Sequence, residues 1–370
     1  MIPVNTPLIA GNEKKYLNEC IDTGWISSEG PFVKRFETEM AKYANREYGI
    51  AVCNGTAALE LAAKAIGIEE GDEVIMPTFT IISPAQAVSK LGAKPILVDS
   101  DPQTWNMDVT QIEEKITAKT KAIIVVHIYG LPVDLNPVME LCKKYDLKLI
   151  EDAAEMHGQT YNGKPCGSFG DVSIFSFYPN KHITTGEGGM VVTNDAELAN
   201  RCQRLRNLCF KPEQRFVHDE IGWNYRMTNL QAALGVAQLE QIDTFVDKKR
   251  AMGKQYTQLL SELEDKIELP LAYTEYADNI YWVYGIILKD HVNITAKDVM
   301  QAMGEKKIGT RPFFYPMHKQ PVYNKKRWYI NESYPVAERM AERGFYIPSG
   351  LSLSKEEMKI IVHQLKKIIF

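Results

Sequence analysis

Several classes of protein are excluded by what the sequence lacks. Its six cysteines form no C-x-x-C pair, so we predict neither a disulfide framework nor a zinc site, and no metal. No apolar run approaches the roughly 20 residues that cross a bilayer. The N-terminus has no basic region followed by an apolar one, as a signal peptide would. We therefore expect a cytoplasmic protein that does not enter a membrane.

Two further absences concern ligands. The chain has no excess of positive charge, with 43 Lys and Arg against 47 Asp and Glu and a net charge of -4, so nucleic-acid binding is not expected. No G-x-G-x-x-G motif follows an early strand, which argues against a NAD-dependent sugar oxidoreductase, an alternative with a similar pattern of strands and helices.

The 370 residues, 45% of them hydrophobic, favour a large domain followed by a smaller one. We place the boundary near residue 250, with an N-terminal segment and the large domain in 1–250 and the small domain in 251–370. Short apolar strands alternate with helices, as in a mainly parallel sheet covered by helices. The predicted strands are 74–76, 96–98, 122–128, 147–150, 172–177, 190–193 and 282–288.

The helices are predicted from apolar spacing and from their end signals. One long helix, 228–263, is expected to bridge the domains, with Gly235 and Gly253 as weak points, and the basic run 248–250 is read as its exposed face. The last helix starts at Ser354 with acidic residues in its first turn. The other predicted helices are 54–66, 135–145, 196–208 and 296–307.

Lys181 lies on a glycine-rich turn that follows a predicted strand. An amine must lose its proton to form a Schiff base, and burial near a cationic cofactor could lower its pKa far enough. A lone lysine on a turn is more often simply exposed. Asp152, at the end of strand 147–150, changes this interpretation, because a buried carboxylate can keep the ring nitrogen of pyridoxal phosphate (PLP) protonated. Alone, Asp152 could equally cap the next helix.

A third element is the turn Asn54-Gly55-Thr56-Ala57 at the start of a helix, where free backbone N–H groups can receive a phosphate. Gly55 allows close approach, Thr56 adds a hydroxyl, and Ser176 could add another. A Thr or Asn before a helix is otherwise an ordinary cap.

These three elements, in this order, resemble the DegT-type sugar-nucleotide aminotransferases, which have the aspartate-aminotransferase fold. The resemblance runs nearly end to end, and further matching segments are 24–31, 71–78, 222–227 and 311–318. It implies an α/β chain of PLP-dependent transferase fold type I, with a mainly parallel seven-stranded central sheet in the large domain and a smaller α/β C-terminal domain. It also implies PLP as cofactor and a homodimer with active sites shared between subunits.

The resemblance assigns roles to individual residues. Lys181 is expected to hold PLP, and Asp152 to pair with its ring nitrogen. Because Ile81 stands where many relatives have a stacking aromatic, Phe79 or Ile81 is expected to cover the ring. The other expected cofactor contacts are Gly55, Thr56, Ala57, Glu155, Ser176 and Asn180, with Asn224 reaching the phosphate of a neighbouring subunit.

Within the family, the chain is most similar to enzymes that move the amino group of glutamate to the C4 ketone of GDP-4-keto-6-deoxymannose, giving GDP-perosamine for O-antigen and lipopolysaccharide. The similarity rests on Glu155, on Asn180 with Lys181, and on segment 311–318. Arg226 and Arg311 are expected to bind the diphosphate. Further expected contacts to the sugar nucleotide are Trp25, Ser27, Tyr315 and His318.

Other readings stay open. The keto sugar could be carried on dTDP or UDP. A sister branch uses histidine in place of the lysine and acts as a dehydratase, but Lys181 argues against it, and we expect the adjacent His182 to be a spectator. A non-catalytic binding protein is disfavoured by the intact set of Lys181, Asp152 and Thr56.

Overall fold

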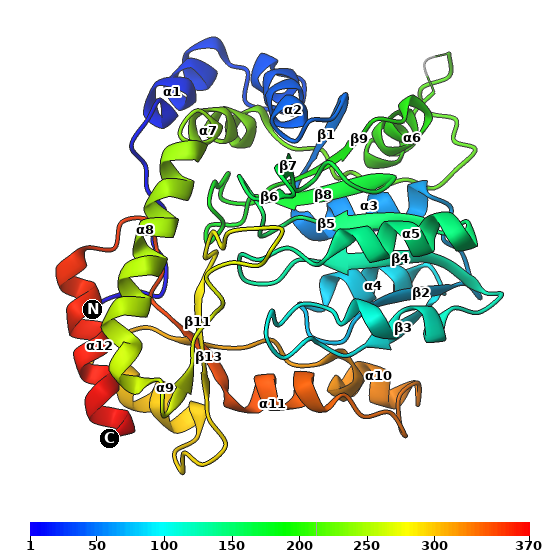
Figure 1. The fold of residues 1–370 in the computed structure, drawn as a ribbon. Helices are drawn as coiled ribbons and strands as arrows, with labels where there is room; N and C mark the ends of the chain where they lie inside the picture. The colour runs from blue at the N-terminus through cyan, green and yellow to red at the C-terminus, as the bar shows by residue number, and fades with distance from the viewer. Residues whose placement is uncertain (212) are drawn as a thin grey trace.

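The computed structural model describes residues 1–211 and 213–370, and its centre is a seven-stranded sheet (Figure 1). The strand order is β1-β9-β8-β5-β4-β2-β3, and β9 alone runs against the other six. The mainly parallel sheet predicted from the sequence is thus confirmed. The strands are β1 (Tyr48–Val52), β2 (Glu73–Pro77), β3 (Lys94–Val98), β4 (Thr120–Val126), β5 (Lys148–Asp152), β8 (Val172–Ser176) and β9 (Gly189–Thr193).

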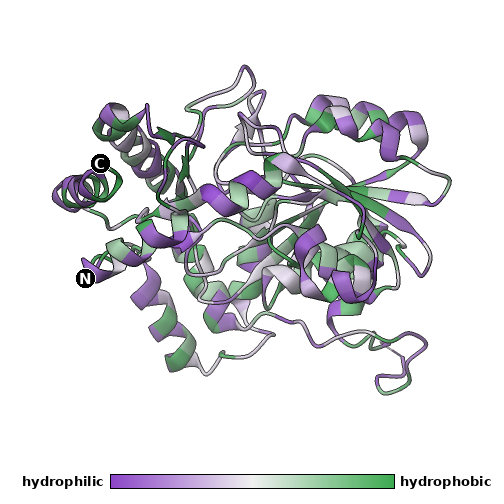
Figure 2. Ribbon diagram, turned by 90° about the horizontal axis from the view of Figure 1, so that it is seen from below, coloured by the Kyte–Doolittle hydropathy of each residue, from purple (hydrophilic) through white to green (hydrophobic). Residues whose placement is uncertain are grey.

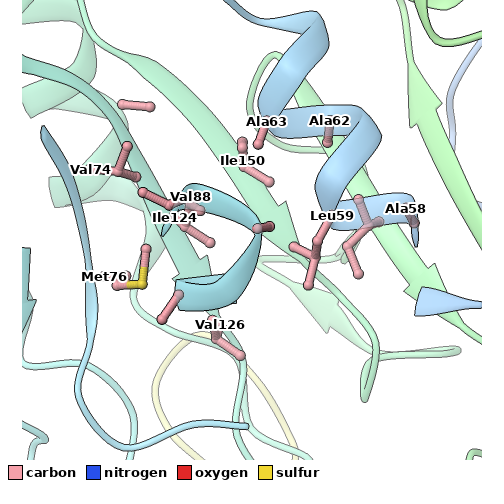
Figure 3. Close-up of a cluster of buried hydrophobic side chains, with 14 of the residues drawn as sticks. Ala58, Leu59, Ala62, Ala63, Val74, Met76, Val88, Ile124, Val126 and Ile150 are labelled. Atoms are coloured by element: carbon pink, nitrogen blue, oxygen red, sulfur yellow. The ribbon is translucent and has the colours of Figure 1, made fainter. Parts of the chain in front are cut away.

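Both faces of this sheet are buried, because its strands are apolar at successive positions. Along β4, Ile124 and Val126 belong to one core, and Ile123 and Val125 to the other. The first core lies under α3 (Gly55–Ala65) and α4 (Ser83–Lys90), as the close-up in Figure 3 shows. The second lies under α1 (Glu13–Thr23), α2 (Pro31–Tyr43), α5 (Leu135–Tyr145) and α7 (Asn229–Leu239). Helix α6 (Ala196–Arg206) packs beside α3.

A second, antiparallel sheet in the order β10-β11-β13-β12 forms the centre of the C-terminal part. Its strands are β10 (Ile267–Glu268), β11 (Tyr284–Leu288), β12 (Arg311–Pro312) and β13 (Gly344–Ile347). Helices α8 (Ile242–Leu260), α9 (Ala296–Glu305) and α12 (Lys355–Ile369) enclose a third core with it. Helix α12 begins with the capping box of Ser354 and Glu357.

The predicted bridging helix is two helices, α7 and α8, which meet at Glu240 and Gln241. The interruption does not lie at the two glycines, since Gly235 is inside α7 and Gly253 is inside α8. A Cβ at Gly235 would lie 2.6 Å from the ring of Phe36, and one at Gly253 would collide with Tyr281, so both glycines allow close packing. The predicted boundary at residue 250 falls inside α8, and the division into two domains at this point stays a prediction.

The basic run in α8 was read as an exposed face, and this is wrong for Lys249. Its side chain is 1% exposed, and its ammonium donates to the carbonyls of Trp282, at 2.8 Å, and of Ser349. Helical spacing turns Lys249 toward the segments that carry Trp282 and Ser349, while Lys248 faces solvent.

The N-terminal segment and α11 (Pro335–Arg343) are among the parts that join the C-terminal sheet and its helices to the rest of the chain. The N-terminal residues pair with the C-terminal part, since Ile2 bridges Ile308 and the carbonyl of Val4 accepts from Ser349. On the other side, the N–H of Ala337 in α11 donates to the carboxylate of Asp99, which follows β3. The remaining elements are α10 (Pro321–Lys325), the hairpin β6 (Thr160–Tyr161) and β7 (Lys164–Pro165), and 3₁₀ turns at Val109–Gln111, Glu113–Lys115, Ser261–Leu263 and Met317–Lys319.

The distribution of hydropathy follows this architecture. Figure 2 shows green along the central strands and purple alternating with green along the outer helices. Among the described residues, no helix combines the length and the apolar character needed to cross a membrane.

Candidate active site

A cavity of about 660 Å³ lies where β5 and β8 end and α3 begins. Its size is in the range of small-molecule sites. Carboxyl ends of parallel strands are where open α/β sheets present ligands. Eight of the predicted cofactor residues line it together: Gly55, Thr56, Ala57, Asp152, Glu155, Ser176, Asn180 and Lys181.

Lys181 reaches into the cavity from the loop between β8 and β9. That loop is closed on itself, because the N–H groups of Phe177 and Thr185 bond to the carbonyls of Gly188 and Phe177. The Lys181 Nζ atom is 3.6 Å from the Glu155 Oε1 atom, and the lysine side chain is 11% exposed. Burial lowers the pKa of Lys181, while Glu155 and Asp152 act against this shift. The amine is thereby brought closer to the neutral form that attacks a carbonyl.

Two carboxylates share this end of the cavity. Asp152 is 2% exposed and accepts the N–H of Ala154 at 3.1 Å. Glu155 accepts the N–H of Tyr129 at 2.8 Å. Burial raises the pKa of Asp152 to about 6 and that of Glu155 to about 7. A cationic group bound beside Asp152 would favour its charged form.

The first turn of α3 has the free N–H groups that can serve as an anion cradle. Asn54 caps the helix by accepting the Ala57 N–H at 2.8 Å, whereas Gly55 and Thr56 precede the first helical hydrogen bonds. A Cβ at Gly55 would lie 2.8 Å from the Ser176 Cβ, so only glycine leaves the cradle open. The Thr56 and Ser83 hydroxyls, 2.9 Å apart, add donors beside it. Of the three predicted cofactor contacts in 55–57, Ala57 already donates its N–H to the Asn54 side chain.

These groups fit pyridoxal phosphate. One amine, one buried carboxylate and one anion cradle face the same space, matching the aldehyde, the ring nitrogen and the phosphate of that cofactor. The Asn180 Oδ1 atom is buried and lacks a hydrogen-bond partner among the described residues, so it is free to take one from a ligand.

Phe79 and His318 lie away from the cavity wall. Phe79 is fully buried among Tyr129 and Phe313, and Ile81 lines the cavity in its place. His318, predicted to touch the substrate, is 5% exposed, and its two ring nitrogens face Thr78 at 2.8 Å and Glu338 at 3.0 Å. Because it is buried and hydrogen-bonded to both side chains, His318 links the segments of Thr78 and Glu338 and is not accessible to a substrate.

The remaining predicted contacts are not on the cavity wall of the single protomer. Arg226 donates from Nε to the Asn224 side chain at 2.9 Å. All except the half-buried Arg226 are exposed. These residues are Trp25, Ser27, Asn224, Arg226, Arg311 and Tyr315.

Several lining residues were missed in the sequence. Trp282 opens the predicted strand 282–288, and Phe314 lies inside the matching segment 311–318, so both had a local signal. Tyr346 had none, because β13 was not predicted. Tyr178 stands three positions before Lys181, and nothing in the pattern of the turn distinguishes it as a lining residue.

One further polar cluster, of His127, Glu151 and Cys166, is fully buried, with Glu151 next to Asp152 on β5. Glu151 accepts the N–H groups of Gly167 and Phe169, and His127 Nδ1 accepts that of Val133. The polar atoms of His127 and Glu151 are therefore bonded within the fold, as expected for a structural network.

Comparisons with known proteins agree with this site. The profile of the DegT/DnrJ/EryC1/StrS aminotransferase family matches residues 7–366. The chain is 44% identical to a GDP-perosamine synthase of Escherichia coli O157:H7 over 99% of this chain and 98% of that one. It is 41% identical to a GDP-perosamine synthase of Vibrio cholerae, with the same coverage.

Solved structures show the same relationship. S. venezuelae DesV, in complex with a ketimine intermediate, is 30% identical over 96% of this chain and 94% of that one, with a TM-score of 0.88. A cavity with a buried amine, a carboxylate and a phosphate cradle, and a family match over almost every residue, lead to one conclusion. The chain belongs to the DegT/DnrJ/EryC1/StrS aminotransferase family.

Proposed function

We propose that this aminotransferase moves the amino group of glutamate to the C4 ketone of GDP-4-keto-6-deoxymannose and so forms GDP-perosamine. The observation that carries the proposal is the convergence of Lys181, Asp152 and the first turn of α3 on one cavity. The choice of sugar nucleotide is supported by the end-to-end identity to GDP-perosamine synthases. Use of the product in O-antigen and lipopolysaccharide, and a cytoplasmic location, belong to the same proposal.

The cofactor is pyridoxal phosphate, which when bound supplies a carbonyl for amines and a ring that withdraws electrons from the reacting carbon. Asp152 would hold the ring nitrogen in its protonated form. Gly55, Thr56 and Ser176 would hold the phosphate. Ile81 stands on the cavity wall where it could cover the ring.

Lys181 has two tasks. Its neutral amine binds the cofactor before amino transfer, and after release its Nζ atom carries the proton to and from the reacting carbon. Burial favours the neutral form, and Glu155 at 3.6 Å favours the protonated one. Opposing effects of this kind let one amine serve as base and then as acid near neutral pH.

The proposal is tested with purified protein, PLP, glutamate and a panel of nucleotide sugars. The panel contains GDP-4-keto-6-deoxymannose, 4-keto-6-deoxy sugars on dTDP and UDP, and a 3-keto sugar on UDP. We expect an aminated sugar nucleotide and 2-oxoglutarate from the GDP sugar, identified by mass spectrometry. Amination of a dTDP or UDP sugar instead would support the aminotransferase activity but contradict GDP-4-keto-6-deoxymannose as its substrate.

A matched pair of variants tests the amine. Lys181→Ala should abolish turnover and the cofactor linkage that borohydride makes permanent. Lys121→Ala, at an exposed position on β4, should change neither. Activity in Lys181→Ala would refute the role of Lys181.

We also propose a homodimer with shared active sites. The cavity wall carries two cations among the described residues, Lys181 and Lys90, and Lys90 is paired with Glu60 at 2.6 Å. A nucleotide diphosphate needs more positive charge than this. Asn224 and Arg226 lie off the wall of their own protomer, so we assign them to the cavity of the partner.

A further inference from the structure

The indole ring of Trp282 lies over the amine of Lys181. The Nζ atom is 3.9 Å from the centroid of the ring, which is 3% exposed. At this distance the electron-rich face of tryptophan attracts an ammonium group, and more strongly when both are shielded from water. The contact therefore favours the protonated form of the lysine.

Trp282 is held in this position from several sides. Its Nε1–H donates to the carbonyl of Asn180 at 2.8 Å, which ties it to the residue before the lysine. Its own carbonyl accepts from the buried ammonium of Lys249 at 2.8 Å. Its ring packs against Tyr129 with the centroids 5.9 Å apart. The ring and the lysine loop are thus fixed relative to each other.

Other groups around Lys181 do not replace this contact. Burial lowers its pKa, and Glu155 and Asp152 oppose that shift. Under the proposed function, the Asp152 charge is shared with the ring nitrogen of the cofactor. His157 and His182 are buried, and burial lowers their pKa values, to about 3 for His157, so both are neutral. Trp282 is a neutral group that stabilises the ammonium directly.

We propose that Trp282 is a positioning residue for Lys181. The indole face of Trp282 holds the ε-ammonium of Lys181 whenever that amine is released from the cofactor. The ring keeps the amine in the cavity, close to Glu155, instead of letting it turn away with its proton. The inference rests on the proposed role of Lys181, but its test needs neither substrate nor turnover.

The test measures the pKa of Lys181 in the cofactor-free protein. Competitive acetylation across pH, read by mass spectrometry with exposed Lys121 as reference, reports that pKa directly. Trp282→Leu keeps an apolar cover and removes the ring face, so it should lower the pKa of Lys181 by roughly half a unit to one unit. Trp282→Phe should give a smaller downward shift.

A second form of the test preserves packing. Tetrafluorotryptophan placed at position 282 keeps the indole shape and N–H but loses the electron-rich face, and it should lower the pKa as Leu does. Trp328→Leu is the matched control, since Trp328 lies 4.3 Å from the Lys326 ammonium, away from the cavity, and should leave Lys181 unchanged. An unchanged or raised Lys181 pKa in the fluorinated protein would overturn the inference. If the Lys181 pKa falls in the fluorinated protein but the native protein shows no transamination, the proposed function is rejected and the inference on Trp282 stands.

Discussion

At the scale of single residues, position 81 is where the cofactor ring is expected to be covered. The resemblance leads us to expect a stacking aromatic there, whereas Ile81 lines the cavity and is 50% exposed. Phe79 cannot take that role in this conformation, because it is fully buried. An aliphatic side chain covers a ring by dispersion without the added attraction between offset aromatic faces.

We therefore expect Ile81→Phe to bind PLP more tightly. An aromatic pair adds about 0.5–1.5 kcal/mol, which corresponds to roughly 2- to 10-fold in Kd. Absorbance titration of the cofactor-free protein with PLP measures this Kd. Ile360→Phe on α12, at 51% exposure, is the control and should have no effect. Weaker binding by Ile81→Phe would mean that Ile81 does not face the ring.

Glu155 predicts a dependence of stability on pH. In the folded, cofactor-free protein, burial raises its pKa to about 7 from an ordinary value of 4.5. The folded state thus holds a proton that the unfolded chain has released, so the free energy of unfolding falls as pH rises through this window. This contribution should lower the melting temperature as pH rises from about 5 to 7, whereas the lowered pKa values of buried His157 and His182 act in the opposite direction.

Glu155→Gln should remove this contribution, because the amide can still accept from the Tyr129 N–H but does not titrate, so its melting temperature should fall less, or rise more, with pH than that of the native protein. The difference in slope should be several degrees over the window. Melting curves of the cofactor-free proteins measure it, with exposed Glu70→Gln as control. Equal slopes in the native protein and Glu155→Gln would show that another group sets the pH dependence.

At the scale of secondary-structure elements, we propose that the first turn of α3 binds the phosphate of the cofactor. Gly55→Ala should weaken PLP binding by roughly tenfold or more, because the added Cβ meets Ser176 and overpacking costs about 1–3 kcal/mol. Gly304→Ala in α9 is the control, since its added Cβ would meet no atom within 4 Å beyond its chain neighbours and its own helix backbone. It should leave binding unchanged and stabilise the protein by about 0.5–1 kcal/mol. Native affinity in Gly55→Ala would place the phosphate elsewhere.

At the scale of the whole molecule, the proposed dimer predicts complementation. Lys181→Ala and the double variant Asn224→Ala with Arg226→Ala should each be inactive or nearly so. Coexpressed, they form mixed dimers in which one of the two sites is intact, so activity should return to roughly a quarter of native in a symmetric dimer. Sedimentation checks the oligomeric state. A mixture as inactive as its components would place each site within one protomer.

The sequence by itself determined the sheet and the chemical groups of the site. Apolar strands, the Gly55 turn, Asp152 at a strand end and Lys181 on its loop are local patterns, and parallel strands bring their carboxyl ends to one edge of a sheet. The limits of α5, Leu135–Tyr145, were predicted to the residue, because a stretch of one amphipathic face between two strands is a local pattern. Strand β1 was missed, as a five-residue run containing Gly49 gives little periodicity.

Only the tertiary structure decided which side chains face the cavity. Phe79 and Ile81 stand two positions apart, and their segment turns Ile81 to the cavity wall and Phe79 into the core. His318 and Lys249 are polar residues whose burial follows from partners far away in the chain, Thr78 and Ser349. Trp282 meets Lys181 across about a hundred positions. Local patterns fix which element a residue belongs to, whereas the direction of a side chain depends on packing between distant elements.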